Sequence, residues 1–339
     1  MKDKPLKTIH GLLSVAPMME WTTSSARYFL RLLAPRVRLY TEMVPAVALW
    51  HGRAERFLPF DPAEHPLALQ LGGHDPQHLR YGAELAAEWG YDEVNLNVGC
   101  PSERVQSGRF GACLMREPEL VRECVAAMTE AGLPITVKCR IGVDHDDSEA
   151  QLLHFIERVA DGGCDCFIVH ARKAWLQGLS PKENREIPPL HYERVWRVKE
   201  CFPELEVVLN GGVADEQTLI EQLARVDGVM VGRAAFADPY ALACWESRLF
   251  GGTVPSRRAA VEAYLPFVES QLQAGVPMTH LVKVLMGLYS GRPGGKRWRR
   301  ALTLGSQRPG AGPEAIAAAL DEVEDALPHY GDRTQWGQI

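Results

Sequence analysis

The chain has 339 residues, of which 46% are hydrophobic and 24% are charged. This composition is typical of a globular protein with a large apolar core, and the length allows a second domain beside an α/β barrel of about 250 residues. The net charge of −6 argues against a uniformly basic nucleic-acid binder but is compatible with a local basic site.

The charge is unevenly distributed along the chain. Residues 247–339 carry 11 Lys and Arg against 8 Asp and Glu, whereas residues 1–246 carry 26 against 35. The C-terminal part is therefore the more electropositive. None of the eight cysteines forms a CxxC pair, and neither an apolar signal segment nor a run of about 18 apolar residues occurs. We expect a cytoplasmic protein with reduced cysteines and no membrane partner.

Short apolar runs alternate with helical patterns over residues 1–246. Most runs are rich in Val, Ile and Leu, as expected for parallel strands covered by helices. Eight successive β-then-α units predict an α/β protein with a (β/α)8 TIM barrel. A doubly wound sheet would need a GxGxxG turn after the first strand, which is absent. The predicted strands are Leu12–Pro17, Leu39–Val44, Leu67–Gly72, Glu93–Val98, Ile135–Ile141, Cys166–Ala171, Glu206–Gly212 and Gly228–Gly232.

Residues 247–339 show no further strand pattern and predict a separate, all-helical C-terminal domain. Glycine-containing breaks at 251–252, 275–277 and 291–295 divide it. The predicted helices are Arg257–Ala274, Met278–Tyr289, Trp298–Leu304 and Pro313–Leu327.

Polar residues interrupt several predicted strands near their C-terminal ends, where barrel enzymes carry their active sites. Any one of them could equally belong to a hydrogen-bonded layer inside the barrel, but four strands that end this way favour a site. The residues are Gln70, Asn95, Asn97, Lys138, Arg140 and His170.

The last two strands end in glycines, at Asn210-Gly211-Gly212 and at Gly232-Arg233. Loops at these positions commonly bind phosphate, although tight strand-to-helix turns are the alternative. The pattern favours a phosphate-bearing cofactor. The eleven histidines show no metal-ligand spacing such as HxxxH, so we expect no metal site.

A flavin is one cofactor that these residues could accommodate. Lys138 could lie beside the electron-rich N1–C2 edge of the ring and Gln70 beside its pyrimidine edge, while Pro17 and Met18 lie against the ring. The residues alone support a phosphorylated cofactor, and the identification of that cofactor as a flavin is an additional inference.

Several motifs together resemble those of the tRNA-dihydrouridine synthases. They are Ala16-Pro-Met18, Asn95-Leu-Asn-Val-Gly-Cys-Pro-Ser102, Lys138-Cys-Arg140, His170-Ala-Arg172 and Asn210-Gly-Gly212. Residues 171–190, hereafter the insertion, and Gly291-Arg-Pro-Gly-Gly-Lys-Arg-Trp-Arg-Arg300 resemble segments typical of the A subfamily. The resemblance covers nearly the whole chain.

The resemblance implies an FMN-binding barrel over residues 1–246 and a helical tRNA-binding domain over 247–339. It implies NADPH as the hydride source, Cys100 as the proton donor, and uridines 20 and 20a of the tRNA D-loop as substrates. The implied tRNA contacts are Asn97, Lys182, Arg185, Arg297 and Arg300, although a solvated charged face is the alternative for the last four. The implied FMN contacts are Pro17, Met18, Gln70, Lys138, His170, Asn210, Gly211, Gly212, Gly232 and Arg233.

Reduction of the uracil C5=C6 bond needs a hydride at one carbon and a proton at the other. We expect reduced FMN N5 to deliver the hydride to C6 and Cys100 to protonate C5, because an ordinary thiol is mostly protonated at neutral pH. The polar stretch 102–111 is either a mobile lid over the base or a long surface loop.

Two other functions are compatible with parts of the sequence. An FMN barrel that reduces a small pyrimidine or an enone would explain the cofactor residues and Cys100 but not the basic helical tail. A non-catalytic RNA-binding protein would explain the tail but not Cys100 and Lys138. We expect tRNA as the partner, with no DNA and no obligate protein partner, while the oligomeric state is left open.

Overall fold

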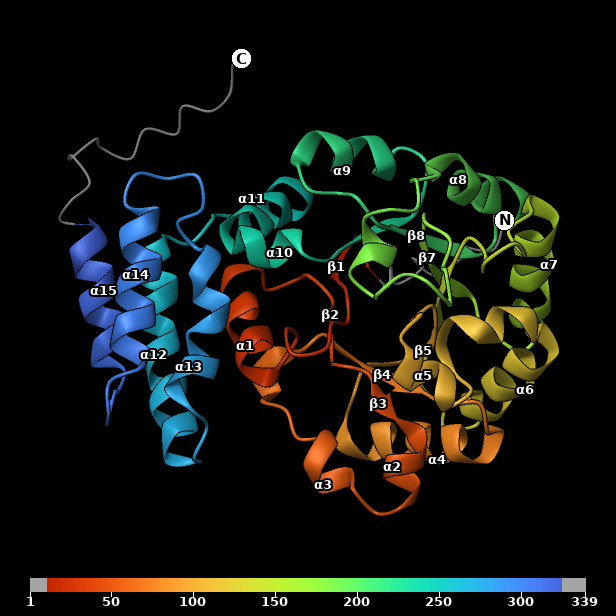
Figure 1. Cartoon of the computed structure of the whole chain (residues 1–339), viewed down its shortest axis with the longest axis horizontal. Coiled ribbons are helices and arrows are strands. Elements are labelled where there is room, and N and C mark those ends of the chain that lie inside the picture. The colour runs from red at the N-terminus through yellow and green to blue at the C-terminus, as the bar shows by residue number, and fades with distance from the viewer. Residues whose placement is uncertain (1–10, 325–339) are drawn as a thin grey trace, which may run out of the picture. The chain divides into compact units, whose positions relative to one another are not determined.

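The computed structural model describes residues 11–324, which form two compact units. Among these residues, the barrel unit comprises 11–27 and 36–234, and the helical unit comprises 28–35 and 235–324 (Figure 1). The functional division predicted at residues 246 and 247 stays a prediction.

The barrel unit is built on parallel strands in the order β1-β9-β8-β7-β6-β5-β4-β2, with β3 also paired to β4. Hydrogen bonds from Val15 N to Arg38 O (2.9 Å) and from Arg38 N to Leu13 O (3.1 Å) join the first strand to the second. The predicted barrel is therefore confirmed. The strands are β1 Leu13–Val15, β2 Leu39–Tyr40, β3 Val44–Pro45, β4 Leu67–Gly72, β5 Glu93–Val98, β6 Ile135–Arg140, β7 Cys166–His170, β8 Glu206–Asn210 and β9 Gly228–Val231.

The second predicted strand, 39–44, is divided into β2 and β3. The Thr41 hydroxyl accepts a hydrogen bond from Gln70 N at 3.1 Å and donates one to Glu42 O at 2.8 Å. A side chain thus takes the N–H of β4 that would otherwise bond to a main-chain carbonyl, which interrupts the ladder.

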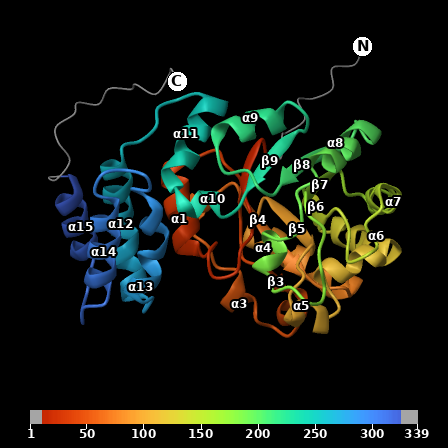
Figure 2. The ribbon, with the colours of Figure 1, turned by 45° about the horizontal axis from the view of Figure 1, so that its top comes forward.

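Helices surround the strands (Figures 1 and 2). Their starts follow from local capping chemistry: the Asp75 carboxylate accepts from two amides at the start of α4, and Ser148 with Gln151 forms a capping box on α7. The longer helices of the barrel unit are α4 Pro76–Trp89, α6 Pro118–Thr129, α7 Glu149–Ala160, α8 Tyr192–Cys201 and α9 Glu216–Leu223, whereas α1 Ser24–Leu33 begins in the barrel unit and continues in the helical unit. Shorter ones are α2 Ala46–Trp50, α3 Ala54–Phe57, α5 Glu103–Ser107, η1 Pro62–Glu64, η2 Gly111–Arg116 and η3 Glu183–Arg185.

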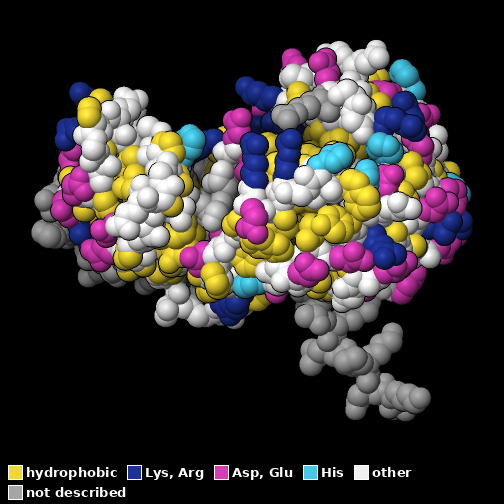
Figure 3. Space-filling model, turned by 90° about the horizontal axis from the view of Figure 1, so that it is seen from below, with side chains coloured by type: hydrophobic (Ala, Val, Ile, Leu, Met, Phe, Trp, Pro, Cys, Tyr) yellow, Lys and Arg dark blue, Asp and Glu magenta, His cyan; other side chains and the backbone are white. Residues whose placement is uncertain are grey.

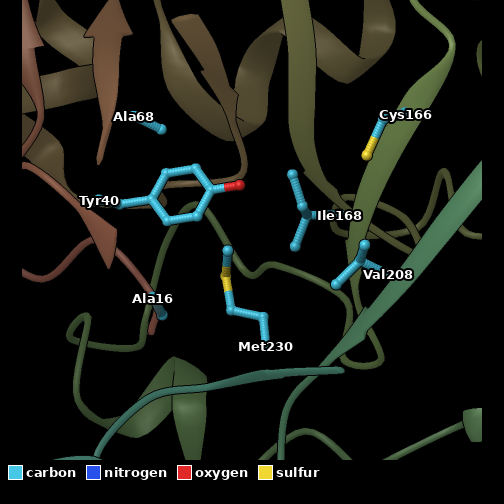
Figure 4. Packing of buried hydrophobic residues seen from close by; sticks show 7 residues of the cluster. All are labelled: Ala16, Tyr40, Ala68, Cys166, Ile168, Val208 and Met230. Carbon is cyan, nitrogen blue, oxygen red and sulfur yellow. The ribbon is translucent and has the colours of Figure 1, made fainter. Parts of the chain in front are cut away.

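Part of the barrel interior is filled by seven buried side chains, six of them on strands and Ala16 directly after β1, which converge in Figure 4. Burial of this apolar surface stabilises the barrel and leaves its C-terminal mouth for polar residues. The cluster consists of Ala16, Tyr40, Ala68, Cys166, Ile168, Val208 and Met230, with Met18 packed against it. On the face in Figure 3, acidic and basic side chains of the barrel unit are interspersed.

The helical unit contains α10 Ala234–Ala237, α11 Pro239–Phe250, α12 Arg257–Gln273, α13 Met278–Leu281, η4 Lys283–Gly287, α14 Gly295–Ser306 and α15 Glu314–Glu324. The helix predicted over Met278–Tyr289 is divided into α13 and η4. The end of the last predicted helix, residues 325–327, lies outside the described residues. Trp298 is fully buried and donates from Nε1 to Leu285 O at 2.6 Å. No described helix has the length and hydropathy that a membrane crossing requires.

Candidate active site

Parallel register brings the polar strand ends together at the mouth of the barrel. Gln70 pairs with Asn95, Asn97 with Lys138, Arg140 with His170, and His170 with Asn210. Residues two apart on one strand share a face, so these side chains form a continuous polar layer across β4 to β8.

Hydrogen bonds connect this layer to the turn that carries Cys100. Gln70 donates from Nε2 to Asn95 Oδ1 at 2.7 Å and accepts at Oε1 from Asn97 Nδ2 at 2.8 Å. Asn97 Oδ1 in turn accepts from Gly99 N (3.1 Å) and Cys100 N (3.0 Å). Asn97 thus orients the turn before Cys100, and its contact with RNA stays a prediction.

A buried carboxylate anchors the layer from below. Glu93 Oε1 accepts from the Tyr40 hydroxyl at 2.9 Å and from Thr136 Oγ1 at 2.6 Å, and Thr136 accepts from Asn95 Nδ2. Burial, and then the charge of Glu93, raises the pKa of Tyr40 well above its usual value. Glu93 was not predicted as an interior residue, although it lies two residues before Asn95 and so on the same face.

Lys138 and His170 occupy the electropositive part of the mouth. Lys138 Nζ donates to Asn210 Oδ1 at 2.9 Å, and burial, then repulsion from Arg140, lowers its pKa to about 8. The pKa of His170 lies well below its usual value, because the ring is buried and lies near Arg140 and Lys138. The imidazole is therefore neutral at neutral pH, while Lys138 keeps most of its charge.

The glycine turn after β8 leaves no room for a side chain. Gly211 and Gly212 have φ of +110° and +75°, and a Cβ on Gly211 would lie 2.5 Å from His170 Cδ2. Tyr192 donates from its hydroxyl to Gly211 O at 3.0 Å and holds the turn. At Gly232, by contrast, the nearest atom to an added Cβ would be Met18 Sδ, at 3.7 Å. The packing at Gly232 would thus admit a methyl group in ordinary van der Waals contact.

Arg233 is exposed, and its guanidinium pairs with Glu186 of the insertion. An anion bound here would therefore compete with that carboxylate for Arg233. Beside Gly232, in the segment that follows the neighbouring strand β1, Met18 N donates to Thr22 Oγ1 at 3.0 Å, which orders the segment that contains Pro17.

Cys100 is partly exposed, and its Sγ lies 3.5 Å from Ser102 Oγ. The stretch after it, 102–111, contains the short helix α5 and is thus not an irregular loop throughout. Whether it moves as a lid stays a prediction. Among the described residues, no group of three potential metal ligands occurs.

The predicted tRNA contacts occur in both units. Lys182 and Arg185 are exposed in the barrel unit and flank the buried Asn184. In the helical unit, Arg297 and Arg300 are exposed on α14, while Trp298 anchors that helix in the interior. Helix α14 begins three residues before the predicted start, after Gly294 with φ of +86°.

The fold and site define an α/β-barrel protein whose mouth combines a polar layer with buried cations, a glycine turn after β8 and a partly exposed cysteine. Residues 14–324 match the model of the family described as "Dihydrouridine synthase (Dus)". The chain belongs to the dihydrouridine synthase family.

Three relatives named tRNA-dihydrouridine(20/20a) synthase are similar over most of their length. The protein from Xanthomonas axonopodis pv. citri (strain 306) is 55% identical over 92% of this chain and 94% of its own. Those from Shewanella oneidensis (strain MR-1) and Synechocystis sp. (strain PCC 6803) are each 52% identical. They cover 95% and 91% of this chain, and 96% and 93% of their own lengths.

Proposed function

We propose that this protein reduces the C5=C6 bond of uridines 20 and 20a in the tRNA D-loop, with FMN as cofactor and NADPH as hydride source. The observation that carries the proposal is the 55% identity to a relative of that name, together with Cys100 at the barrel mouth. Since tRNA is the substrate, we propose that the enzyme acts in the cytoplasm.

The residues at the mouth fit a phosphorylated flavin. The glycine turn at Gly211 and Gly212, together with Gly232 and the exposed guanidinium of Arg233, is the proposed phosphate site. Lys138, Gln70, His170, Asn210, Pro17 and Met18 would hold the ring and the ribityl chain. When bound, the flavin supplies the hydride for the uracil ring. Lys138, largely charged at neutral pH, would stabilise negative charge in its surroundings.

Cys100 is the proposed general acid, which transfers its proton from Sγ to C5 of the uracil. Asn97 orients its backbone through two hydrogen bonds, so the thiol has a defined position on the mouth. A uridine in folded tRNA must be unstacked to reach it. Lys182, Arg185, Arg297 and Arg300 are the proposed contacts that hold the RNA backbone.

The test is position-resolved mapping of dihydrouridine. Purified protein, FMN and NADPH are incubated with tRNA from a strain that lacks these enzymes. New dihydrouridine at positions 20 and 20a supports the proposal. Reduction elsewhere in the D-loop would support uridine reduction as the reaction but refute positions 20 and 20a as its targets. Oxidation of NADPH by a small enone or pyrimidine without any tRNA product would instead favour a small-molecule reductase.

A further inference from the structure

The two carbonyl groups that flank Cys100 are both held by side chains that also bind the insertion. Gly99 O accepts from Arg140 Nε at 2.9 Å, and Pro101 O accepts from Gln106 Nε2 at 2.8 Å. Cys100 therefore lies between two anchored peptide groups.

Arg140 binds the insertion at two places. Its Nη1 donates to Lys173 O at 3.1 Å and to Asn184 O at 3.0 Å. The side chain is buried, and although burial lowers its pKa to about 10, it stays charged at neutral pH. Charge-assisted hydrogen bonds from a rigid, planar guanidinium hold acceptors in a fixed relative geometry.

Gln106 makes a second, independent connection. The same Nε2 that binds Pro101 O donates to Leu176 O at 2.8 Å, across 70 residues of sequence. The two hydrogens of this amide are thus shared between the catalytic turn and the insertion.

The insertion is ordered at the residues that these bonds reach. The buried side chain of Asn184 accepts from Trp175 N at 2.7 Å and donates to Trp175 O at 2.9 Å. Asn184 lies between Lys182 and Arg185, the proposed RNA contacts of this unit. A displacement of the RNA-binding part of the insertion would therefore be transmitted to the Cys100 turn.

We propose that Arg140 and Gln106 are positioning residues that couple the insertion to Cys100. RNA bound to the insertion then has a fixed position relative to the Cys100 thiol. This inference rests on the proposed function. Neither side chain needs to contact the reacting atoms, because both act through backbone carbonyls.

The first test is Gln106→Leu in the FMN-loaded enzyme. This substitution removes both hydrogen bonds that the Gln106 amide donates and keeps a side chain of similar size. The enzyme is reduced with NADPH under anaerobic conditions, and its reoxidation by tRNA is followed in a single turnover. We expect reoxidation about tenfold to a hundredfold slower, because small misplacements of a catalytic group cost rates of this order. NADPH-driven reduction and tRNA affinity should stay within about twofold of wild type. Gln177→Leu, at an exposed glutamine of the insertion, is the matched control and should behave as wild type.

Reoxidation at the wild-type rate in Gln106→Leu would overturn the proposal, and so would an equal slowing of the NADPH step. Arg140→Lys keeps the charge but loses the guanidinium fork, so it should show the same selective defect.

Hydrogen exchange separates this inference from the proposed function. In Gln106→Leu, amide exchange should rise both in residues 101–107 and in residues 173–184, whether or not the enzyme turns over tRNA. A rise confined to 101–107 would refute the coupling. If the wild-type enzyme failed to reduce any tRNA, the proposed function would fail, and the exchange pattern would still decide the coupling.

Discussion

Lys138 of β6 donates from Nζ to Asn210 Oδ1 of β8 at 2.9 Å, across the intervening strand β7. Asn210 donates in turn to Met230 O of β9 at 2.8 Å. The ammonium group is thus held over the interior of the barrel by a residue whose own orientation is fixed by a third strand.

Replacement of Lys138 by Met should change how the rate of flavin reduction by NADPH depends on pH. The pKa of about 8 means that the wild-type ammonium loses its charge as the pH rises through 8. Because that charge would stabilise the reduced flavin, we expect NADPH-driven reduction to slow above pH 8 in wild type. Lys138→Met should be about tenfold or more slower at pH 7 and should lack this decline. Stopped-flow measurements from pH 6.5 to 9.5 give the rate of flavin reduction for both proteins. The same pH dependence in wild type and Lys138→Met would contradict the proposed role of the Lys138 charge.

Replacement of Cys100 by Ala should affect only the step that uses tRNA. We expect flavin reoxidation by tRNA to slow about a hundredfold or more, since positioned general acids contribute this much. Reduction by NADPH should be unchanged. Cys113→Ala, at another partly exposed cysteine of the same region, is the control. A Cys100→Ala enzyme that reduced tRNA at the wild-type rate would exclude the cysteine as the acid.

Gly212→Ala tests the role of the glycine turn after β8, and the same substitution at Gly132, a glycine of nearly the same φ elsewhere in the barrel unit, is the comparison. Gly132 has φ of +77° with no atom within 4 Å of an added Cβ, whereas Gly212 has φ of +75° with Leu190 Cδ1 only 2.4 Å from an added Cβ. Gly132→Ala should cost about 1–2 kcal/mol of unfolding free energy from backbone strain alone. Gly212→Ala should cost more and also weaken FMN binding several-fold. Equal losses of unfolding free energy in the two variants, with unchanged FMN affinity, would show that the turn does not bind FMN.

His170 should make the protein less stable in acid. Its folded-state pKa lies well below the unfolded value of about 6.5, so below pH 6.5 the unfolded chain binds a proton that the folded chain does not. The free energy of unfolding therefore decreases as the pH decreases below 6.5, by up to about 1.4 kcal/mol per pH unit. His170→Gln should reduce this slope between pH 6.5 and 5.5 in urea titrations of the flavin-free protein. A slope identical to wild type would mean that other groups cause the acid sensitivity.

The double variant Arg297→Ala with Arg300→Ala should weaken tRNA binding and reduce its dependence on salt. Each lost phosphate contact lowers the slope of log K against log salt by about 0.7 to 0.9, so the pair should lower it by roughly 1.5. Fluorescence titrations at several salt concentrations measure this change. Arg308→Ala, at another exposed arginine of the helical unit, is the control. An unchanged slope in the double variant would remove these residues from the RNA contact.

Residue patterns alone predicted the barrel and most of its strands. The reason is local: buried apolar runs such as Leu67–Gly72 report burial on both faces, and period-two spacing places Asn95 and Asn97 on one face. Because the C-terminal ends of barrel strands meet at one mouth, the positions of Lys138 and His170 near the site followed from the same pattern. The division of residues 39–44 was not predictable, since it depends on the Thr41 hydroxyl meeting Gln70.

Only the tertiary structure revealed how the site is held together. The bonds from Arg140 to Gly99 and Asn184 span 41 and 44 residues, and Gln106 reaches Leu176 across 70. Periodicity reports which way a side chain faces relative to its own strand or helix, but not which distant carbonyl lies in front of it. Sequence thus determined the kind of fold and the chemical groups at the mouth. Their mutual positions, including the connection of Cys100 to the insertion, depend on long-range packing that no local pattern encodes.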